Sequence, residues 1–389
     1  MRAFYNFTWN KQNYEVKALF AKIEEKLNDF MSHGIPWNDL VIYHKGKCVY
    51  RSMRGTLDLE RKIPVTGKEK SNIFSCSKVI TCTAALMLYE KGLFRLGDLL
   101  TDYFPEYAKM TVKEKDGTLR EANTPIRIKD LFCMTAGFTY DLRSPAMKRL
   151  KEETAGACAT RDFARYLAED PLAYEPGESW QYSLAHDVLA ALVELISDTE
   201  FDAFCKKNIF DPVGMKDTSF LLPYDEYDTV APLYCHNAEL GKPVKCSPVP
   251  VYRLGPQHAS GGAGCVSTVD DYIHFLEALR KCELISESTL SLMSSDALTE
   301  RQTKAYNGGA YSYGLGVRCA KSGSAVTEFG WGGAAGCYLT VDPKNEFTAF
   351  YAQHVLASPV QALRSTLYPL ITEALGGAHP LSNNDKSGF

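Results

Sequence analysis

Segments with the composition of β-strands lie at both ends of this chain, and the long region between them carries helical patterns. Near the N-terminus, Leu40 to Tyr43 and Cys48 to Ser52 are β-rich runs separated by the turn residues His44-Lys45-Gly46-Lys47, which predicts a hairpin. Four runs near the C-terminus are also predicted strands: Tyr313 to Cys319, Ala325 to Phe329, Gly336 to Val341 and Phe347 to Gln353.

Apolar residues at helical spacing predict one helix before the first strand, over residues 15–33, and one after the last, from Pro359 to Leu375. The region between the two β-rich ends has further helical patterns: Ala85 to Tyr89, Ile128 to Phe132, Arg161 to Leu167, Ala185 to Ile196, Phe201 to Ile209 and Thr268 to Leu279.

Strands at both ends with helices between them imply an α/β (α+β) fold with one antiparallel sheet. We expect the sheet to be built from both chain ends, flanked by the terminal helices, with a mostly helical lobe inserted. The 389 residues exceed the usual size of a single core, which allows two lobes or one elaborated domain. We assign 1–82 and 305–389 to the sheet and 83–304 to the helical lobe, with the active site in the cleft between them.

Composition narrows the class of ligand. Hydrophobic residues make up 45% of the chain and charged residues 23%, which is ordinary for a globular protein. The net charge of -4 and the absence of any long basic run argue against nucleic acid or an anionic membrane surface as partner. We therefore expect a small-molecule substrate and leave the oligomeric state open.

The same sequence predicts neither a cofactor nor a metal. The twelve cysteines form no C-x-x-C pair and no Cys/His cluster at zinc spacing, so they resemble reduced, buried thiols. Met1 to Lys11 lacks the apolar core of a signal peptide, and no segment reaches the ~18 apolar residues of a membrane span, so we expect a cytoplasmic protein. The dinucleotide, Walker A, H-E-x-x-H and G-x-S-x-G motifs are also missing.

One S-x-x-K motif, Ser75-Cys76-Ser77-Lys78, stands at the start of a predicted helix. If Ser75 lies on the first turn, Lys78 shares its face and can reach its hydroxyl, which activates a serine without a histidine. The partial positive charge of the helix end favours the anion formed when Ser75 attacks a carbonyl. The pattern alone fits equally an N-cap serine followed by a solvent-facing lysine.

Two later segments fit an acyl-transfer site. Tyr182 stands in a turn-rich loop just before a predicted helix, where its phenol can relay protons or simply pack in the core. Trp331-Gly332-Gly333 follows a predicted strand, and its glycines let a ligand approach the backbone closely.

Taken in this order, Ser75-x-x-Lys78, Tyr182-Ser183 and Trp331-Gly332-Gly333 resemble the serine β-lactamase and penicillin-binding protein superfamily, in its class C-like branch. Supporting phrases lie along most of the chain: Gly34-Ile35-Pro36, Leu131 to Phe138, Pro176-Gly177, Gly214 to Phe220, and Gly261 to Thr268 followed by Asp270-Asp271.

Two departures separate the chain from the antibiotic-hydrolysing members. Those enzymes have Tyr-x-Asn and Lys-Thr-Gly at the second and third motifs, whereas this chain has Leu184 in place of the amide and Trp331 in place of the cation. The combination is similar to the family VIII carboxylesterases, the β-lactamase-like esterases, and to fungal acyltransferases of the same fold.

The resemblance implies a serine hydrolase that cleaves short-chain carboxylic esters through an acyl-enzyme on Ser75. Lys78 and Tyr182 are then the general base and acid, and either can take the Ser75 proton. The backbone N–H groups of Ser75 and Ala334 form the oxyanion hole. Trp331, Gly332 and Gly333 bind substrate, although for the indole a role in the wall or core fits equally well.

Several alternatives stay open at this point. A β-lactamase, a D-amino-acid peptidase acting on an amide, or an acyltransferase has the same fold, and a non-catalytic relative could use the cleft for binding. A histidine triad through His186, His258 or His354 is a rival mechanism, but no nucleophile elbow accompanies these residues. We interpret Cys76, next to Ser75, as a packing residue.

Overall fold

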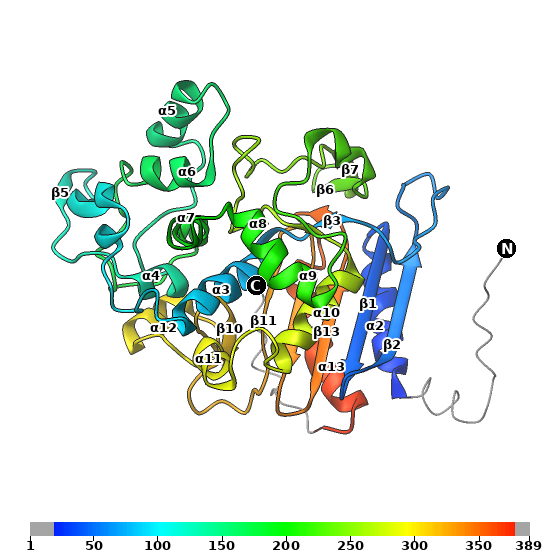
Figure 1. Ribbon diagram of the computed structural model, residues 1–389. Helices are drawn as coiled ribbons and strands as arrows, with labels where there is room; N and C mark the ends of the chain where they lie inside the picture. Colours follow the sequence, from blue (N-terminus) through cyan, green and yellow to red (C-terminus); the bar gives the residue numbers. More distant parts are fainter. Residues whose placement is uncertain (1–18, 378–389) are drawn as a thin grey trace.

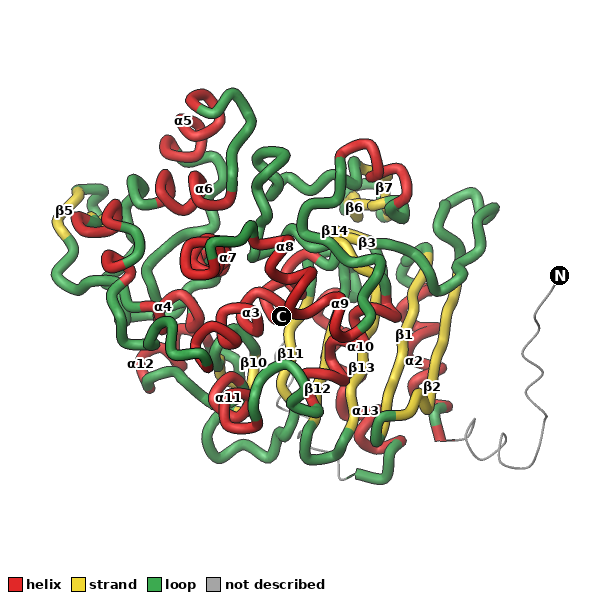
Figure 2. Tube along the Cα trace, in the orientation of Figure 1, coloured by secondary structure: helices red, strands yellow, loops and turns green. Residues whose placement is uncertain are grey.

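The computed structural model describes residues 19–377, and its centre is a seven-stranded antiparallel sheet (Figures 1 and 2). Strand β1 pairs with β13, with Val41 opposite Phe350, so the two chain ends meet in one sheet, as predicted. In sheet order the strands are β2 (Lys47–Gly55), β1 (Trp37–His44), β13 (Phe347–Ala352), β12 (Tyr338–Asp342), β11 (Phe329–Gly332), β10 (Arg318–Ala320) and β9 (Tyr311–Tyr313).

Turn residues set where these strands end. Lys45 and Gly46, with φ of 51° and 77°, make the two-residue turn of the β1–β2 hairpin. The prediction of one strand over Tyr313 to Cys319 is wrong, because Gly314 donates to the Val317 carbonyl at 2.9 Å and reverses the chain between β9 and β10. The strand predicted over Ala325 to Phe329 begins only at Phe329, so the Trp-Gly pair of the third motif lies inside β11.

The sheet has helices on both faces. Phe30 of α2 (Ala21–Ser32) contacts Tyr351, whereas Tyr272 of α10 (Val269–Arg280) stacks on the neighbouring Phe350. Because adjacent residues of a strand point to opposite faces, the two helices cover opposite faces of the sheet.

The two terminal helices also meet. Helix α13 (Leu367–Ala374) contacts α2, so helices from the two chain ends lie together beside the sheet (Figure 1). A 3-10 helix, Gln361–Thr366, comes before α13, and the two occupy most of the single helix predicted from Pro359. The start of the first predicted helix, and Met1 to Lys11, lie outside the described residues.

Most of the helices lie in the middle of the chain, where long loops join them (Figure 2). Its remaining helices are α3 (Ser77–Glu90), α4 (Ile128–Cys133), α5 (Pro145–Glu153), α6 (Thr160–Leu167), α7 (Ala185–Ser197), α8 (Phe201–Cys205), α9 (Asp211–Val213), α11 (Glu287–Met293) and α12 (Glu300–Tyr306). Short strands pair as β3 (Ser71–Asn72) with β8 (Val266–Ser267) and β4 (Thr111–Lys113) with β5 (Leu119–Glu121). A third small sheet has β6 (Leu233–Asn237) between β14 (Val355–Leu356) and β7 (Lys242–Cys246).

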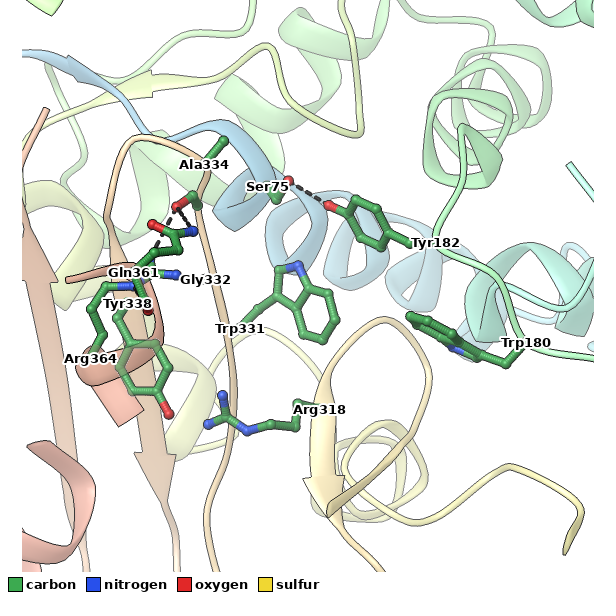
Figure 3. Close-up of a pocket in the computed structure, with 11 residues that line it drawn as sticks. Ser75, Trp180, Tyr182, Arg318, Trp331, Gly332, Ala334, Tyr338, Gln361 and Arg364 are labelled. Atoms are coloured by element: carbon green, nitrogen blue, oxygen red, sulfur yellow. Dashed lines mark hydrogen bonds between the residues drawn. The ribbon is translucent and has the colours of Figure 1, made fainter. Parts of the chain in front are cut away.

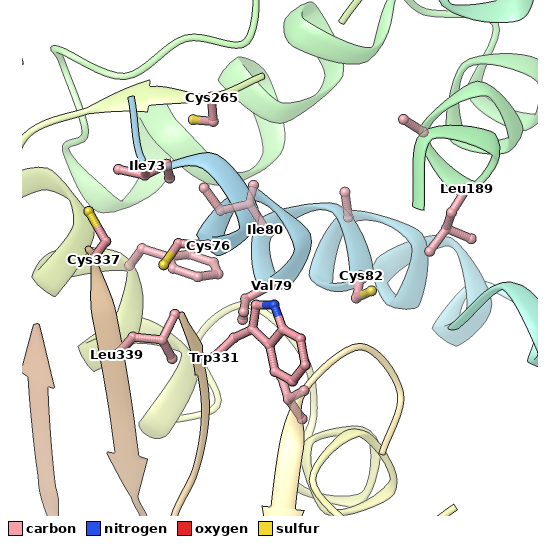
Figure 4. Packing of buried hydrophobic residues seen from close by; sticks show 14 of the residues in the cluster. Ile73, Cys76, Val79, Ile80, Cys82, Leu189, Cys265, Trp331, Cys337 and Leu339 are labelled. Atoms are coloured by element: carbon pink, nitrogen blue, oxygen red, sulfur yellow. The ribbon is translucent and has the colours of Figure 1, made fainter. Parts of the chain in front are cut away.

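Helix α3 joins the two parts of the molecule through its buried side chains. Cys76 and Val79 lie near Leu339 and Trp331 of the sheet, and Figure 4 shows Leu189 of α7 across from the helix. Residues from Ser77 to Leu86 on this helix are all buried. The N-terminal end of α3 is therefore fixed between the sheet and the helical region.

The division into a sheet unit (1–82 and 305–389) and a helical unit (83–304) stays a proposal. Helix α10 falls within the second range, yet it packs on β13 and β1. Within residues 19–377, no helix combines the length and apolar character needed to cross a bilayer.

Candidate active site

Ser75 stands on a sharp turn between a strand and a helix. It follows β3 and lies in the 3-10 helix Phe74–Cys76, immediately before α3. Phe74 has φ of 45°, in the left-handed region that a bulky side chain rarely adopts. Phe74 and Cys76 are buried, whereas Ser75 is half-buried and lines a cavity. The turn thus presents the serine hydroxyl to that cavity.

Tyr182 reaches Ser75 from the helical region. Its phenol donates a short hydrogen bond to Ser75 Oγ (Figure 3). The N–H groups of the residues at 181 and 184 donate to carbonyls of the loop 134–139, both at 3.1 Å, so the loop before α7 is held on either side of Tyr182. The structure therefore brings together the first and second motifs.

Aromatic rings fix the orientation of the Tyr182 phenol. The Tyr140 ring stacks on it with centroids 5.2 Å apart and planes within 4°. The Trp331 indole stacks against it with centroids 5.9 Å apart. Trp331 is only 6% exposed, so the indole that replaces the third-motif cation supports the phenol; its contact with substrate stays a prediction.

Lys78 is fully buried one turn after Ser75. Its Nζ donates to the Gly262 carbonyl at 2.6 Å and lies 4.6 Å from the centroid of the Tyr182 ring. Among the described residues, no hydrogen bond joins Lys78 to Ser75. The solvent-facing lysine that the motif alone allowed is excluded, and the amine instead sits beside the phenol that contacts the serine.

Asp187 is a buried carboxylate near Lys78 that the sequence did not single out. Its Oδ1 accepts hydrogen bonds from Ser260 Oγ at 2.5 Å and from the Gly262 N–H at 3.3 Å. Burial raises the pKa of Asp187, and the positive charge of Lys78 opposes that rise. A Cβ on Gly262 would lie 2.5 Å from Asp187 Oδ2 and 3.3 Å from Lys78 Nζ, so this glycine lets the two charged groups flank it.

In sequence, Asp187 had the appearance of an ordinary acidic residue in the first turn of a helix. The motif Gly261 to Thr268 likewise gave no sign that it packs on the start of α3. Only the three-dimensional arrangement brings these residues together.

The turn after β11 approaches Ser75 closely. A Cβ on Gly333 would lie 2.3 Å from the Ile73 carbonyl oxygen, a contact that only glycine avoids. Neither the Ser75 nor the Ala334 N–H donates a hydrogen bond within residues 19–377. Both residues line the cavity, so both donors are available to a ligand there.

The cavity beside Ser75 has a volume of about 380 Å³. Its wall combines four aromatic side chains with polar groups, one of which, Arg318, donates from Nη2 to Glu328 at 2.6 Å. Besides residues already named, the wall contains Trp180, Arg318, Tyr338, Gln361 and Arg364 (Figure 3).

The three histidines near motifs are buried elsewhere. Burial lowers the pKa of His186 and His258 to about 3 and that of His354 to about 4, so all three are neutral near pH 7. None bonds Ser75; His354, for example, accepts a hydrogen bond from the Asn72 N–H at 3.2 Å. A histidine triad is therefore not formed.

Residues 19–377 contain no group of three or more His, Cys, Asp or Glu side chains placed to hold a metal ion.

Comparison with known proteins gives relatives over most of the chain. The family model described as Beta-lactamase matches residues 20–368. Protein Rv1367c of Mycobacterium tuberculosis is 26% identical over 340 residues, which cover 80% of this chain and 84% of that protein. Esterase EstB of Burkholderia gladioli is 29% identical over 263 residues, which cover 62% of this chain and 64% of the esterase.

Solved structures show the same fold. EstCE1, described as a hydrolase with promiscuous acyltransferase activity, superposes with a TM-score of 0.74 at 23% identity and covers 95% of this chain and 100% of its own. Unliganded simvastatin synthase (LovD) from Aspergillus terreus gives a TM-score of 0.72 at 20% identity, with the same coverage. The predicted β-lactamase/transpeptidase-like fold is confirmed.

Proposed function

This chain belongs to the beta-lactamase family, and we propose from that premise that it is a serine hydrolase of short-chain carboxylic esters working through an acyl-enzyme on Ser75. The observation that carries the proposal is the hydrogen bond from the Tyr182 phenol to Ser75 Oγ, with the buried amine of Lys78 beside the same ring. A nucleophile, a proton acceptor and a charge that supports it are the parts this chemistry needs.

In the acylation step, Ser75 Oγ attacks the ester carbonyl carbon and loses its proton to Tyr182. We assign Tyr182 as the immediate acceptor because its oxygen, rather than Lys78 Nζ, contacts Ser75 Oγ. The step starts from the phenolate form of Tyr182, after the phenol that donates to Ser75 Oγ has released its proton to solvent, and the positive charge of Lys78 near the ring stabilises that phenolate. The carbon–oxygen bond to the alcohol then breaks, and Tyr182 returns the proton to the departing oxygen.

The negative charge on the carbonyl oxygen falls between the Ser75 and Ala334 N–H groups. Loss of one such donor typically costs about 10²–10³ in kcat. In the second step, water attacks the acyl-enzyme, gives a proton to Tyr182, and releases the acid as the proton returns to Ser75. Each turnover thus consumes one ester and one water and restores the enzyme.

A neutral ester fits this cavity better than a β-lactam antibiotic, which carries a carboxylate beside its neutral lactam ring. The third-motif position that holds a cation in antibiotic-hydrolysing relatives is Trp331. The two arginines of the wall are already engaged, Arg318 by Glu328 and Arg364 by backbone carbonyls. Leu184, which replaces the second-motif amide, is buried and offers substrate no hydrogen bond.

Hydrolysis of p-nitrophenyl acetate and butyrate tests the proposal. We expect turnover that disappears in Ser75→Ala and persists in a His258→Asn control. Undiminished hydrolysis by Ser75→Ala would refute it. Comparing nitrocefin with the esters separates a β-lactamase, and D-alanyl amides test the peptidase alternative.

An acyltransferase is the second candidate, because relatives with that name share the fold and the cavity has room for an organic acceptor beside Ser75. Adding an alcohol to the ester assay and measuring the ratio of new ester to acid decides between transfer and hydrolysis. A purely binding relative would fail to react with a fluorophosphonate at Ser75.

We also propose a cytoplasmic location. The twelve cysteines, all within the described residues, are free thiols, which suits a reducing compartment. Fractionation of the native cell with thiol titration of the purified protein checks this.

A further inference from the structure

Arg364 is a buried cation that takes no part in the proton transfers of the proposed mechanism. Its side chain lies in the 3-10 helix Gln361–Thr366 and is 2% exposed. No carboxylate among residues 19–377 forms an ion pair with it, and burial lowers the pKa of the Arg364 guanidinium. A buried charge without a counterion destabilises a protein unless hydrogen bonds satisfy it, so the hydrogen-bond partners of the Arg364 guanidinium matter.

Arg364 Nε donates to the Gln361 carbonyl of its own 3-10 helix at 2.9 Å, and the other partners are backbone carbonyls of the turn that joins β11 to β12. Arg364 Nη1 donates to the Gly333 carbonyl at 3.0 Å and also to the Cys337 carbonyl. The Gly333 N–H donates to the same Cys337 carbonyl at 2.8 Å. The guanidinium therefore binds both ends of the turn that carries Ala334.

One of these carbonyls belongs to the peptide group of the oxyanion hole. The Gly333 C=O and the Ala334 N–H share one planar trans peptide and point in opposite directions. Three donors hold the Gly333 oxygen: Arg364, the Gly336 N–H at 3.0 Å, and Gln361 Nε2 at 3.4 Å. Figure 3 shows Arg364 and Gln361 on this side of the turn. With the oxygen fixed, the direction of the Ala334 N–H is fixed as well.

Charge adds to this geometric effect. A cation on a carbonyl oxygen polarises the peptide group and strengthens its N–H as a donor. The first glycine of the third motif makes room for that cation, because a Cβ on Gly332 would lie 3.2 Å from Arg364 Nη2.

We propose that Arg364 is a positioning residue for the oxyanion hole, which holds and polarises the Gly333–Ala334 peptide so that its N–H faces the tetrahedral oxyanion on Ser75. The proposal deepens the proposed function and rests on its assignment of Ala334. It requires that Arg364 act on every reaction at Ser75 that builds negative charge in the hole, whatever the natural ester is.

The test compares Arg364→Lys and Arg364→Met with Arg280→Met, a matched loss of a well-buried arginine that instead pairs with Glu277 on α10. The probes are a fluorophosphonate, phenylboronic acid and p-nitrophenyl butyrate. Both Arg364 variants should lose about 10- to 100-fold in labelling rate and in kcat, with little change in KM. This loss is smaller than the loss expected when one N–H donor of the oxyanion hole is removed altogether. The Ki of the boronic acid should rise by a similar factor, because its tetrahedral adduct also places an oxygen in the hole. Arg280→Met should leave all of these values unchanged.

Rescue distinguishes positioning from simple structural support. Millimolar guanidinium chloride should restore part of the labelling rate of Arg364→Ala and should have no effect on Arg280→Ala. If Arg364→Met fails to fold, Gln361→Ala, which removes the weakest donor to the same carbonyl, should still slow labelling several-fold.

Labelling rates or boronate affinities equal to wild type in folded Arg364 variants would overturn the proposal. A fall in kcat without a rise in the boronate Ki would overturn it too, because the defect would then lie outside the hole. If the proposed ester hydrolysis is wrong, wild type would react with the fluorophosphonate yet hydrolyse no ester. The labelling rates of the variants would still test the role of Arg364 in that case.

Discussion

Replacing Gly333 by alanine should separate the two halves of the oxyanion hole. The added Cβ would lie 2.3 Å from the Ile73 carbonyl oxygen, whereas real Cβ contacts stay beyond 3.0 Å. The backbone fixes the positions of both the added Cβ and the Ile73 carbonyl oxygen, so no side-chain rotation relieves the contact. Ile73 precedes Ser75 by two residues and Gly333 precedes Ala334, so the clash pushes the two N–H donors apart.

The magnitude follows from the size of that clash. Relieving it requires a displacement of roughly 1 Å, and a misplacement of that size costs about 10²-fold in rate. Overpacking of this kind also destabilises a fold by about 1–3 kcal/mol, which a stable protein tolerates. We therefore expect a folded variant with kcat near one hundredth of the wild-type value.

The assay is steady-state hydrolysis of p-nitrophenyl butyrate together with the rate of fluorophosphonate labelling. Gly97→Ala is the matched control, because a Cβ there would meet nothing within 4 Å. A folded Gly333→Ala, checked by circular dichroism, that labels and turns over at the wild-type rate would contradict this clash, as would an equal loss in Gly97→Ala.

Three further predictions follow from the same geometry. Tyr182→Phe keeps the aromatic stack but removes the proton acceptor, so kcat should fall about 10²–10⁴-fold with an unchanged melting temperature; activity near wild type would exclude Tyr182 as the base. Asp187→Asn keeps the hydrogen bond from Ser260 but removes the negative charge beside Lys78. We expect kcat to fall roughly tenfold or more and the pH profile of kcat to shift. An unchanged pH profile would show that the charge of Asp187 does not act on Lys78. Burial lowers the pKa of His354 from 6.5 to about 4, so as pH falls below 6.5 the unfolded chain binds a proton before the folded protein does. The free energy of unfolding therefore declines toward pH 4, and at pH 5 His354 accounts for a loss of about 2 kcal/mol. Urea unfolding at pH 7 and pH 5 should show a smaller decline in His354→Gln than in wild type.

The sheet could be predicted from the sequence because its strands are bounded by strong turn residues. The hairpin at Lys45-Gly46 has the left-handed backbone that such a turn requires, and the pairing of β1 with β13 follows from strands at both ends of the chain. Strand limits near Gly314 and Trp331 were less predictable. A glycine inside an apolar run can continue a strand or reverse it, and only the neighbouring strands decide.

Only the residues of the candidate site that belong to the three motifs could be predicted from the sequence. Ser75 and Tyr182 were expected together, and they share a hydrogen bond. Asp187 and Arg364 could not be found in this way. An aspartate in the first turn of a helix and an arginine near the chain end are ordinary surface residues in sequence, and only burial against Lys78 and against the turn after β11 gives them a chemical role.

The central claim is that an acyl group becomes attached to Ser75 during turnover. Rapid acid quenching of the enzyme with p-nitrophenyl butyrate, followed by peptide mass spectrometry, measures this directly. We predict a butyryl adduct on the peptide that contains Ser75, formed at least as fast as turnover and absent in Ser75→Ala. Hydrolysis that proceeds with no adduct on Ser75, or with the adduct on another residue such as Cys76, would contradict the account.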